Sequence, residues 1–147
     1  MVDDLSTLPD AIDYFESQLD QARAQDLSMR GRPLERIAGD LPSVVELRFG
    51  QLQEIEAILE HLNIQLRKTR SGVFRRYLEN YQRALSSRDV EKYVEGDEAV
   101  VDLAILINQF SLLRNQWLGL LKGLDQKSFG ISNVIRLRTA GLDDATL

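Results

Sequence analysis

The fold is decided by residues 41–85, which read LPSVVELRFGQLQEIEAILEHLNIQLRKTRSGVFRRYLENYQRAL. Large apolar residues recur here every three or four positions, the spacing of one helix face; they are Val45, Leu52, Ile55, Leu59, Leu62, Leu66 and Val73. An unbroken helix over this stretch would be about 65 Å long, more than the width of a compact domain of this size. Such a helix must bury its apolar face against another helix of the chain, against another copy, or against both.

The rest of the chain also predicts helices, so we expect a single all-α domain over residues 1–147. Residues 1–40 form a short N-terminal helix and a loop, and residues 41–85 form the long helix. A turn at Ser86 starts a return helix over 86–125, which makes a long helical hairpin. Residues 126–141 form a C-terminal helix that mediates assembly into a homo-oligomer, because the apolar stripes are too long and wide for one chain to bury.

The charge of the chain changes sign along the long helix. The first 66 residues contain 13 acidic and 5 basic residues, whereas residues 67–92 contain eight basic and three acidic ones. The whole chain has a formal net charge of −5. A basic stretch confined to one part of an acidic chain favours a specific anionic partner over general binding of polyanions.

Composition excludes several classes of protein. The chain has no cysteine, so it has neither disulfides nor thiolate metal sites, as is typical of a reducing cytosol. Its longest apolar run, Leu103 to Ile107, is far shorter than the about 20 residues that span a bilayer. The acidic start lacks the basic and apolar regions of a signal peptide. We therefore expect a cytoplasmic protein that does not contact membranes.

Catalytic chemistry has little support in the sequence. The single histidine, His61, lies on the long helix, where a packed or solvated side chain is far more common than a catalytic base. No phosphate-binding glycine loop and no metal-ligand spacing is present. Phe110 and Trp117 occur at helical spacing and are expected in the core. We expect a protein that is not an enzyme and that uses neither a cofactor nor a metal.

The basic stretch has two interpretations. Its arginines and lysine alternate with Phe74, Tyr77 and Tyr81, and these residue types bind phosphates and stack on bases in single-stranded nucleic acids. Alternatively, the arginines pair with acidic residues of a neighbouring copy, such as Glu54 and Glu60, in a coiled-coil scaffold that binds only protein. Residue chemistry alone leaves both interpretations open.

The C-terminal residues resemble a known family. Residues 124–138 read Leu-Asp-Gln-Lys-Ser-Phe-Gly-Ile-Ser-Asn-Val-Ile-Arg-Leu-Arg and are followed by Ala140-Gly141. This run resembles the end of the phage UvsY-type recombination mediators. Like them, it has a basic residue two positions before an aromatic one, an isoleucine two positions later and an arginine near its close. The likeness extends in pattern from Ser86 onward, and the preceding long helix with basic and tyrosine residues resembles the same family.

This resemblance implies a ring-like helical homo-oligomer without enzymatic activity. Such a protein binds single-stranded DNA (ssDNA) and helps to load a phage recombinase past the single-strand-binding protein during recombination and repair in the infected host cell. The expected DNA-contacting residues are those of the family motif together with the basic stretch: Arg67, Lys68, Arg70, Arg75, Arg76, Tyr77, Tyr81 and Arg83. The expected assembly residues are Leu120, Leu124, Phe129, Ile131, Val134 and Leu137.

Overall fold

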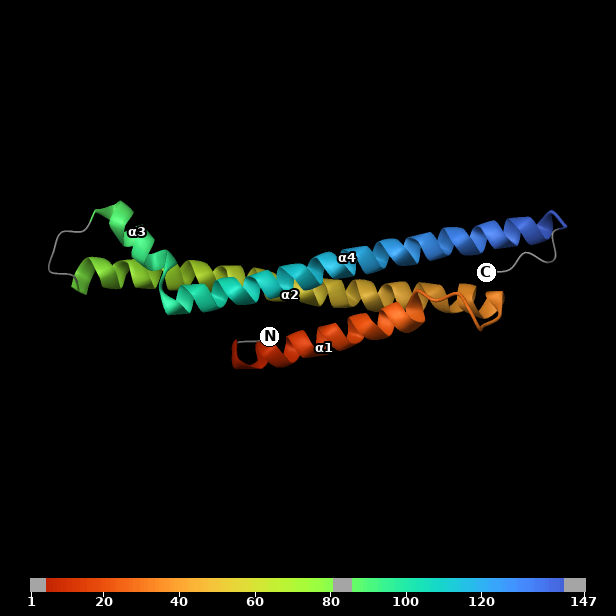
Figure 1. Ribbon diagram of the computed structural model, residues 1–147, viewed down its shortest axis with the longest axis horizontal. Helices are drawn as coiled ribbons and strands as arrows, with labels where there is room; N and C mark the ends of the chain where they lie inside the picture. The colour runs from red at the N-terminus through yellow and green to blue at the C-terminus, as the bar shows by residue number, and fades with distance from the viewer. Residues whose placement is uncertain (1–4, 81–85, 142–147) are drawn as a thin grey trace. The chain divides into compact units, whose positions relative to one another are not determined.

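The structure is a computed structural model that describes residues 5–80 and 86–141, and it contains only helices within these ranges. The elements are η1 (Leu5–Thr7), α1 (Leu8–Gln21), the π-helix η2 (Ala22–Asp26), α2 (Leu34–Asn80), α3 (Ser87–Glu95) and α4 (Glu98–Thr139), as Figure 1 shows. The predicted all-α class is confirmed. The contacts divide the chain into two compact units, and α2 and α4 each contribute to both.

The predicted apolar face of α2, called its seam below, is buried. Six of its seven residues lie in the core: Leu52, Ile55, Leu59, Leu62, Leu66 and Val73. The helix begins at Leu34, earlier than the predicted Leu41, and it continues through Gly39 and Pro42. A proline inside a helix removes one hydrogen bond. Here Ile37 before the proline and Leu52 after it are both buried, so packing of one continuous face outweighs that loss.

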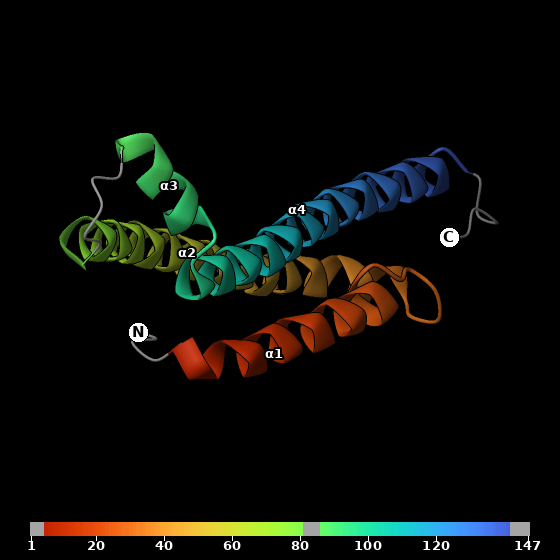
Figure 2. The same ribbon diagram turned by 60° about the vertical axis from the view of Figure 1, so that its left-hand side comes forward.

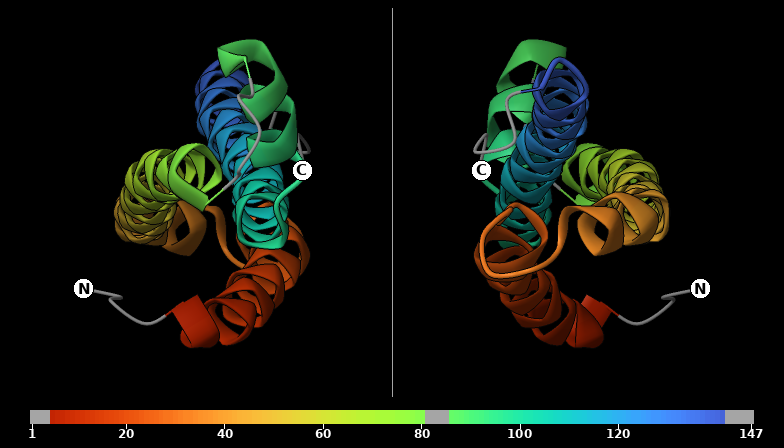
Figure 3. Two further views of the ribbon diagram at one scale, coloured as in Figure 1. Left: turned by 90° about the vertical axis from the view of Figure 1, so that its left-hand side faces the viewer. Right: turned by 90° about the vertical axis from the view of Figure 1, so that its right-hand side faces the viewer.

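The first unit, Met1–Glu54 with Leu113–Leu147, combines α1 with the start of α2 and the end of α4, which Figure 3 shows end-on. Phe15 of α1 packs edge-to-face on Trp117 of α4, with ring centroids 5.7 Å apart. Both rings are buried, and so is Phe110 of the second unit. The prediction that Phe110 and Trp117 are core residues is therefore confirmed.

The second unit, Ile55–Leu112, contains the end of α2, the short helix α3 and the start of α4 (Figure 2). The Ser86 hydroxyl caps α3 by accepting a hydrogen bond from the Asp89 N–H at 3.2 Å, as the predicted turn requires. The helix ends at Glu95, and Gly96 is its C-cap residue. Val90 and Val94 form its buried side.

The helix boundaries after residue 86 differ from the predicted ones. The expected return helix over 86–125 consists of two helices, α3 and α4, and the division falls at Gly96, within the acidic run Glu95–Glu98 that interrupts the helical pattern of the sequence. The C-terminal helix was expected as a separate element over 126–141, but α4 runs unbroken to Thr139. The helix continues because Leu124, Lys127 and Ile131 are all buried in the first unit. This packing outweighs the low helix propensity of Ser128 and Gly130, which lie between them. None of the described helices is apolar over enough residues to cross a membrane.

Candidate nucleic-acid interface

Residues 67–83 are called the basic stretch below, and the described part of this stretch lies on α2 in the second unit. The side chains of Arg67, Lys68, Arg75 and Arg76 are exposed, whereas Arg70 and Tyr77 are half-buried. Tyr81 and Arg83 lie outside the described residues. Residues seven apart on a helix lie close to one face. Lys68 and Arg75 therefore share one row, and Arg70 and Tyr77 share another.

Three cations of the stretch are available to a ligand. Arg67, Lys68 and Arg75 form no ion pair with any residue in the described ranges 5–80 and 86–141. They lie within nine positions of one helix and are exposed to solvent. A cluster of such cations on one helix is suited to contact successive phosphates of a nucleic acid backbone.

Two other arginines of the stretch are paired with acids of their own chain. Arg70 contacts Glu95 through both carboxylate oxygens, with Nε 3.0 Å from Oε1 and Nη2 3.3 Å from Oε2. Arg76 Nη2 lies 3.7 Å from Asp97 Oδ2. Asp97 also caps α4, since its Oδ1 accepts a hydrogen bond from the Ala99 N–H at 3.0 Å. The pairing therefore occurs within one chain, between α2 and the segment that joins α3 to α4.

An aromatic residue of the stretch, Tyr77, also contacts another helix of the same chain. The Tyr77 ring stacks on Tyr93 of α3, with centroids 5.5 Å apart and an interplanar angle of 23°. Two hollows lie in this part of the second unit. One of about 350 Å³ is lined by Arg70, Ser71, Phe74, Glu91, Val94 and Glu95, and one of about 190 Å³ by Arg76, Tyr77, Asn80 and Asp97.

Sequence reasoning missed Tyr93, Glu95 and Asp97 as parts of this site. They lie between 16 and 25 positions after the α2 residues that they contact. The turn at Ser86 and the acidic run from Glu95 to Glu98 were visible in the sequence. A short helix folding back onto α2 would have brought the acidic run to the basic stretch, so the pairing could have been anticipated in outline.

The first unit holds a separate polar cluster that joins η2 to α1, α2 and α4. Arg48 is 2% exposed and donates from Nε to Asp26 Oδ2 at 2.6 Å. Its Nη1 donates to Gln18 and Gln51. Lys127, also buried, donates from Nζ to the Asp26 carbonyl at 2.6 Å. Four parts of the unit are thereby held together around Asp26.

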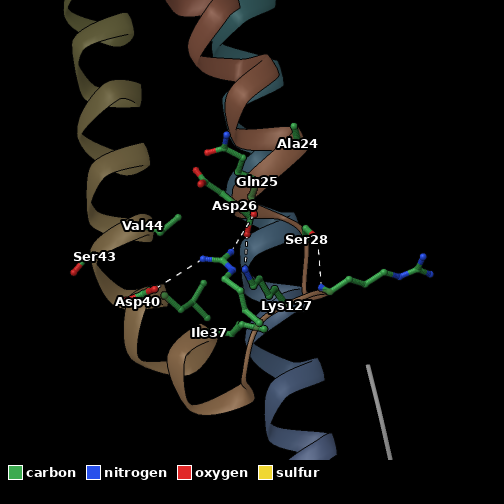
Figure 4. A pocket seen from close by; sticks show the side chains of 12 residues that line it. Ala24, Gln25, Asp26, Ser28, Ile37, Asp40, Ser43, Val44 and Lys127 are labelled. Carbon is green, nitrogen blue, oxygen red and sulfur yellow. Dashed lines mark hydrogen bonds and ion pairs between the residues drawn. The ribbon is translucent and has the colours of Figure 1, made fainter.

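A cavity of about 590 Å³ opens beside this cluster (Figure 4). Lys127, Asp26 and Asp40 line it together with Ile37 and Val44. Burial lowers the pKa of Lys127, and the nearby charge of Arg32 lowers it further, whereas Asp26 and Asp40 raise it. Every one of these charges has a neighbour of opposite sign or a hydrogen-bond acceptor within the cluster, so we interpret the cluster as structural.

The six predicted assembly residues do not form one surface. Four of them are buried within the single chain and belong to its core: Leu120, Leu124, Ile131 and Val134. Phe129 and Leu137 are exposed, with 64% and 44% of their surface accessible. Only these two are free to contact another molecule.

The second unit presents another apolar row. Val101, Ile105 and Leu112 of α4 are all exposed and lie on one helix face. Exposed apolar rows of this kind are typical of protein contact surfaces.

Metal chemistry finds no support in the described ranges. They hold no group of three or more histidine, cysteine, aspartate or glutamate side chains placed to bind a metal ion. His61 is half-buried on α2.

No protein-family model, no curated protein and no solved structure matches this chain. The likeness to UvsY-type mediators therefore rests on the residues quoted for it above.

Proposed function

We propose that this protein is a non-enzymatic recombination mediator that binds ssDNA through the basic stretch of α2 and helps to load a phage recombinase. The observation that carries the proposal is the cluster of exposed cations at Arg67, Lys68 and Arg75, which form no ion pair within the described ranges, in a chain whose net charge is −5. Phosphates provide the repeated negative charge that such a cluster binds. Phe74 and Tyr77, on the same part of the helix, supply rings on which bases stack.

The proposal includes a homo-oligomer. One protomer offers few phosphate contacts, and its acidic first 66 residues repel a strand that approaches them. Repetition of the basic stretch around a ring would raise the affinity for one strand without any new kind of contact. The exposed row of Val101, Ile105 and Leu112 in the second unit supplies apolar surface for contacts between copies. The acidic segments then remain for protein partners, among them the recombinase and the single-strand-binding protein.

Fluorescence anisotropy with a labelled single-stranded oligonucleotide tests the proposal. The triple variant Arg67→Ala, Lys68→Ala, Arg75→Ala removes the unpaired cations and should lose most of its ssDNA affinity. A matched control, Arg23→Ala, Arg114→Ala, Lys122→Ala, removes the same charge from exposed positions outside the stretch and should bind nearly as wild type does.

Two results would count against the mediator. Equal loss in both triple variants would mean that net charge alone governs binding. Absence of ssDNA binding at low salt in the wild type, together with a stable homo-oligomer, would favour the rival function, a scaffold that binds only protein.

A further inference from the structure

The segment from Ser86 to Glu98 places acidic groups directly on the basic stretch. It contains five acidic and two basic residues. Glu95 binds the guanidinium of Arg70 through both oxygens, and Asp97 lies against that of Arg76. Two of the five arginine and lysine side chains between Arg67 and Arg76 are thereby neutralised within the chain.

The contacts made by this segment are of the same kinds that ssDNA would make. A carboxylate that faces one guanidinium with both oxygens, as Glu95 faces Arg70, occupies the position that a phosphate takes in an arginine–phosphate pair. The Tyr93 ring, stacked on Tyr77, occupies a face on which a base would stack. Charged and aromatic contacts are thus both taken by residues of the protein itself.

The same contacts are weak enough to exchange. α3 has nine residues, and helices of this length are marginal without tertiary support. Only Val90 and Val94 are buried on it. The carboxylate of Glu95 is exposed, with 60% of its side chain accessible, and exposed ion pairs contribute little to stability.

We propose that α3 and the adjoining Asp97 form an intramolecular competitor that occupies part of the nucleic-acid interface and is displaced when ssDNA binds. This inference rests on the proposed function. Full engagement of Arg70, Arg76 and Tyr77 then requires the Glu95 and Tyr93 contacts to open. Binding to short or poorly placed strands is weakened, because such strands do not supply enough contacts to replace those of α3.

The double variant Glu95→Gln, Asp97→Asn tests the competitor by removing both charges from the pairs. Asparagine caps a helix about as well as aspartate, so the start of α4 is preserved. Affinity for a labelled single-stranded oligonucleotide should rise between about twofold and about thirtyfold at low salt, the range expected for releasing two exposed ion pairs. The salt dependence should steepen by about 0.7 in log–log slope for each arginine that gains a phosphate.

The control variant Glu98→Gln, Asp102→Asn changes the net charge by the same amount at exposed positions of the same unit. Neither residue is paired with the basic stretch within the described ranges. Its gain in affinity should be clearly smaller. Equal gains in both double variants would show a general charge effect and overturn the competitor.

A tether provides a second measurement that does not depend on charge. The chain has no cysteine, so Ser71→Cys with Glu91→Cys creates a unique pair on the two walls of one hollow. Linking the pair with a cleavable bis-maleimide should lower ssDNA affinity, and cleavage of the linker should restore it. Unchanged affinity in the linked protein would overturn the competitor.

The outcomes separate the two proposals. If wild type binds ssDNA and Glu95→Gln, Asp97→Asn binds equally or more weakly, the mediator stands and the competitor is wrong. If only the double variant binds ssDNA, the competitor is supported in its strongest form. If neither protein binds ssDNA at low salt, both proposals are wrong.

Discussion

Arg48 and Asp26 form a buried ion pair, with Nε and Oδ2 separated by 2.6 Å and only 2% and 14% of the two side chains exposed. The pair joins the long helix α2 to the π-helix η2. It stands on a helix face that is otherwise lined by Leu52 and Ile55. The first unit therefore depends on the buried charge of Arg48 being neutralised by the largely buried carboxylate of Asp26.

Replacing Arg48 should destabilise the first unit strongly. Arg48→Met leaves the Asp26 carboxylate buried without its partner, and such a change costs about 3–5 kcal/mol of unfolding free energy. Urea denaturation followed by circular dichroism measures the loss. Arg48→Met combined with Asp26→Leu should recover much of it, because no unpaired charge then remains. A loss below about 1 kcal/mol in the single variant would show that the pair contributes little.

Two glycines four positions apart on α4 should respond differently to alanine. No atom lies within 4 Å of a Cβ built at Gly119, so Gly119→Ala should raise the unfolding free energy by up to about 1 kcal/mol through helix propensity. A Cβ at Gly123 would lie 2.8 Å from Leu27 Cδ2. Gly123→Ala should therefore be less stable than Gly119→Ala, because the Leu27 side chain must shift to make room for the new methyl group. Equal stabilities by urea denaturation would contradict this close approach.

Lys127 should make stability depend on pH in the alkaline range. Burial lowers the pKa of Lys127 below its ordinary value of 10.5 in the folded chain. Between the lowered pKa and 10.5 the unfolded chain binds more protons, so the contribution of Lys127 to stability rises with pH in that window. The unfolding free energy of wild type minus that of Lys127→Met should therefore increase as pH approaches 10.5 from below. A constant or falling difference would contradict the burial of a charged amine.

The exposed row on α4 should govern assembly. Ile105→Glu with Leu112→Glu places charge on a surface proposed to be covered by another copy, so the oligomer should break into smaller species while helicity is retained. Leu118→Glu, an exposed position of α4 off this row, is the control and should keep the wild-type size. Light scattering at micromolar concentration distinguishes them. A wild type that runs as a clean monomer of 16.7 kDa would contradict the homo-oligomer.

Helical periodicity made much of the fold predictable. The seam of α2, the cap at Ser86 and the core positions of Phe110 and Trp117 all follow from local spacing and residue type, and the structure has them as expected. The continuity of α2 through Pro42 could not be predicted in the same way. Local propensity favours a break there, and only the packing of the whole face decides against one.

The contacts that α3 and Asp97 make with the basic stretch were less predictable, because they too depend on tertiary packing. The basic stretch is evident from composition, but the partners of Arg70 and Tyr77 come from α3, a different helix. Which acids reach which arginines depends on how α3 closes on α2. Arg48 illustrates the same limit, because a charged residue within an apolar seam is ordinarily expected in solvent.

The central claim is that the unpaired cations of α2 contact DNA phosphates, and the salt dependence of ssDNA binding tests it most directly. The slope of log affinity against log salt should be negative for wild type, because phosphate contacts release counterions. In Arg67→Ala, Lys68→Ala, Arg75→Ala the slope should be shallower by about 2, since each lost contact to a single strand contributes about 0.7. A triple variant with the wild-type slope and affinity would contradict the claim.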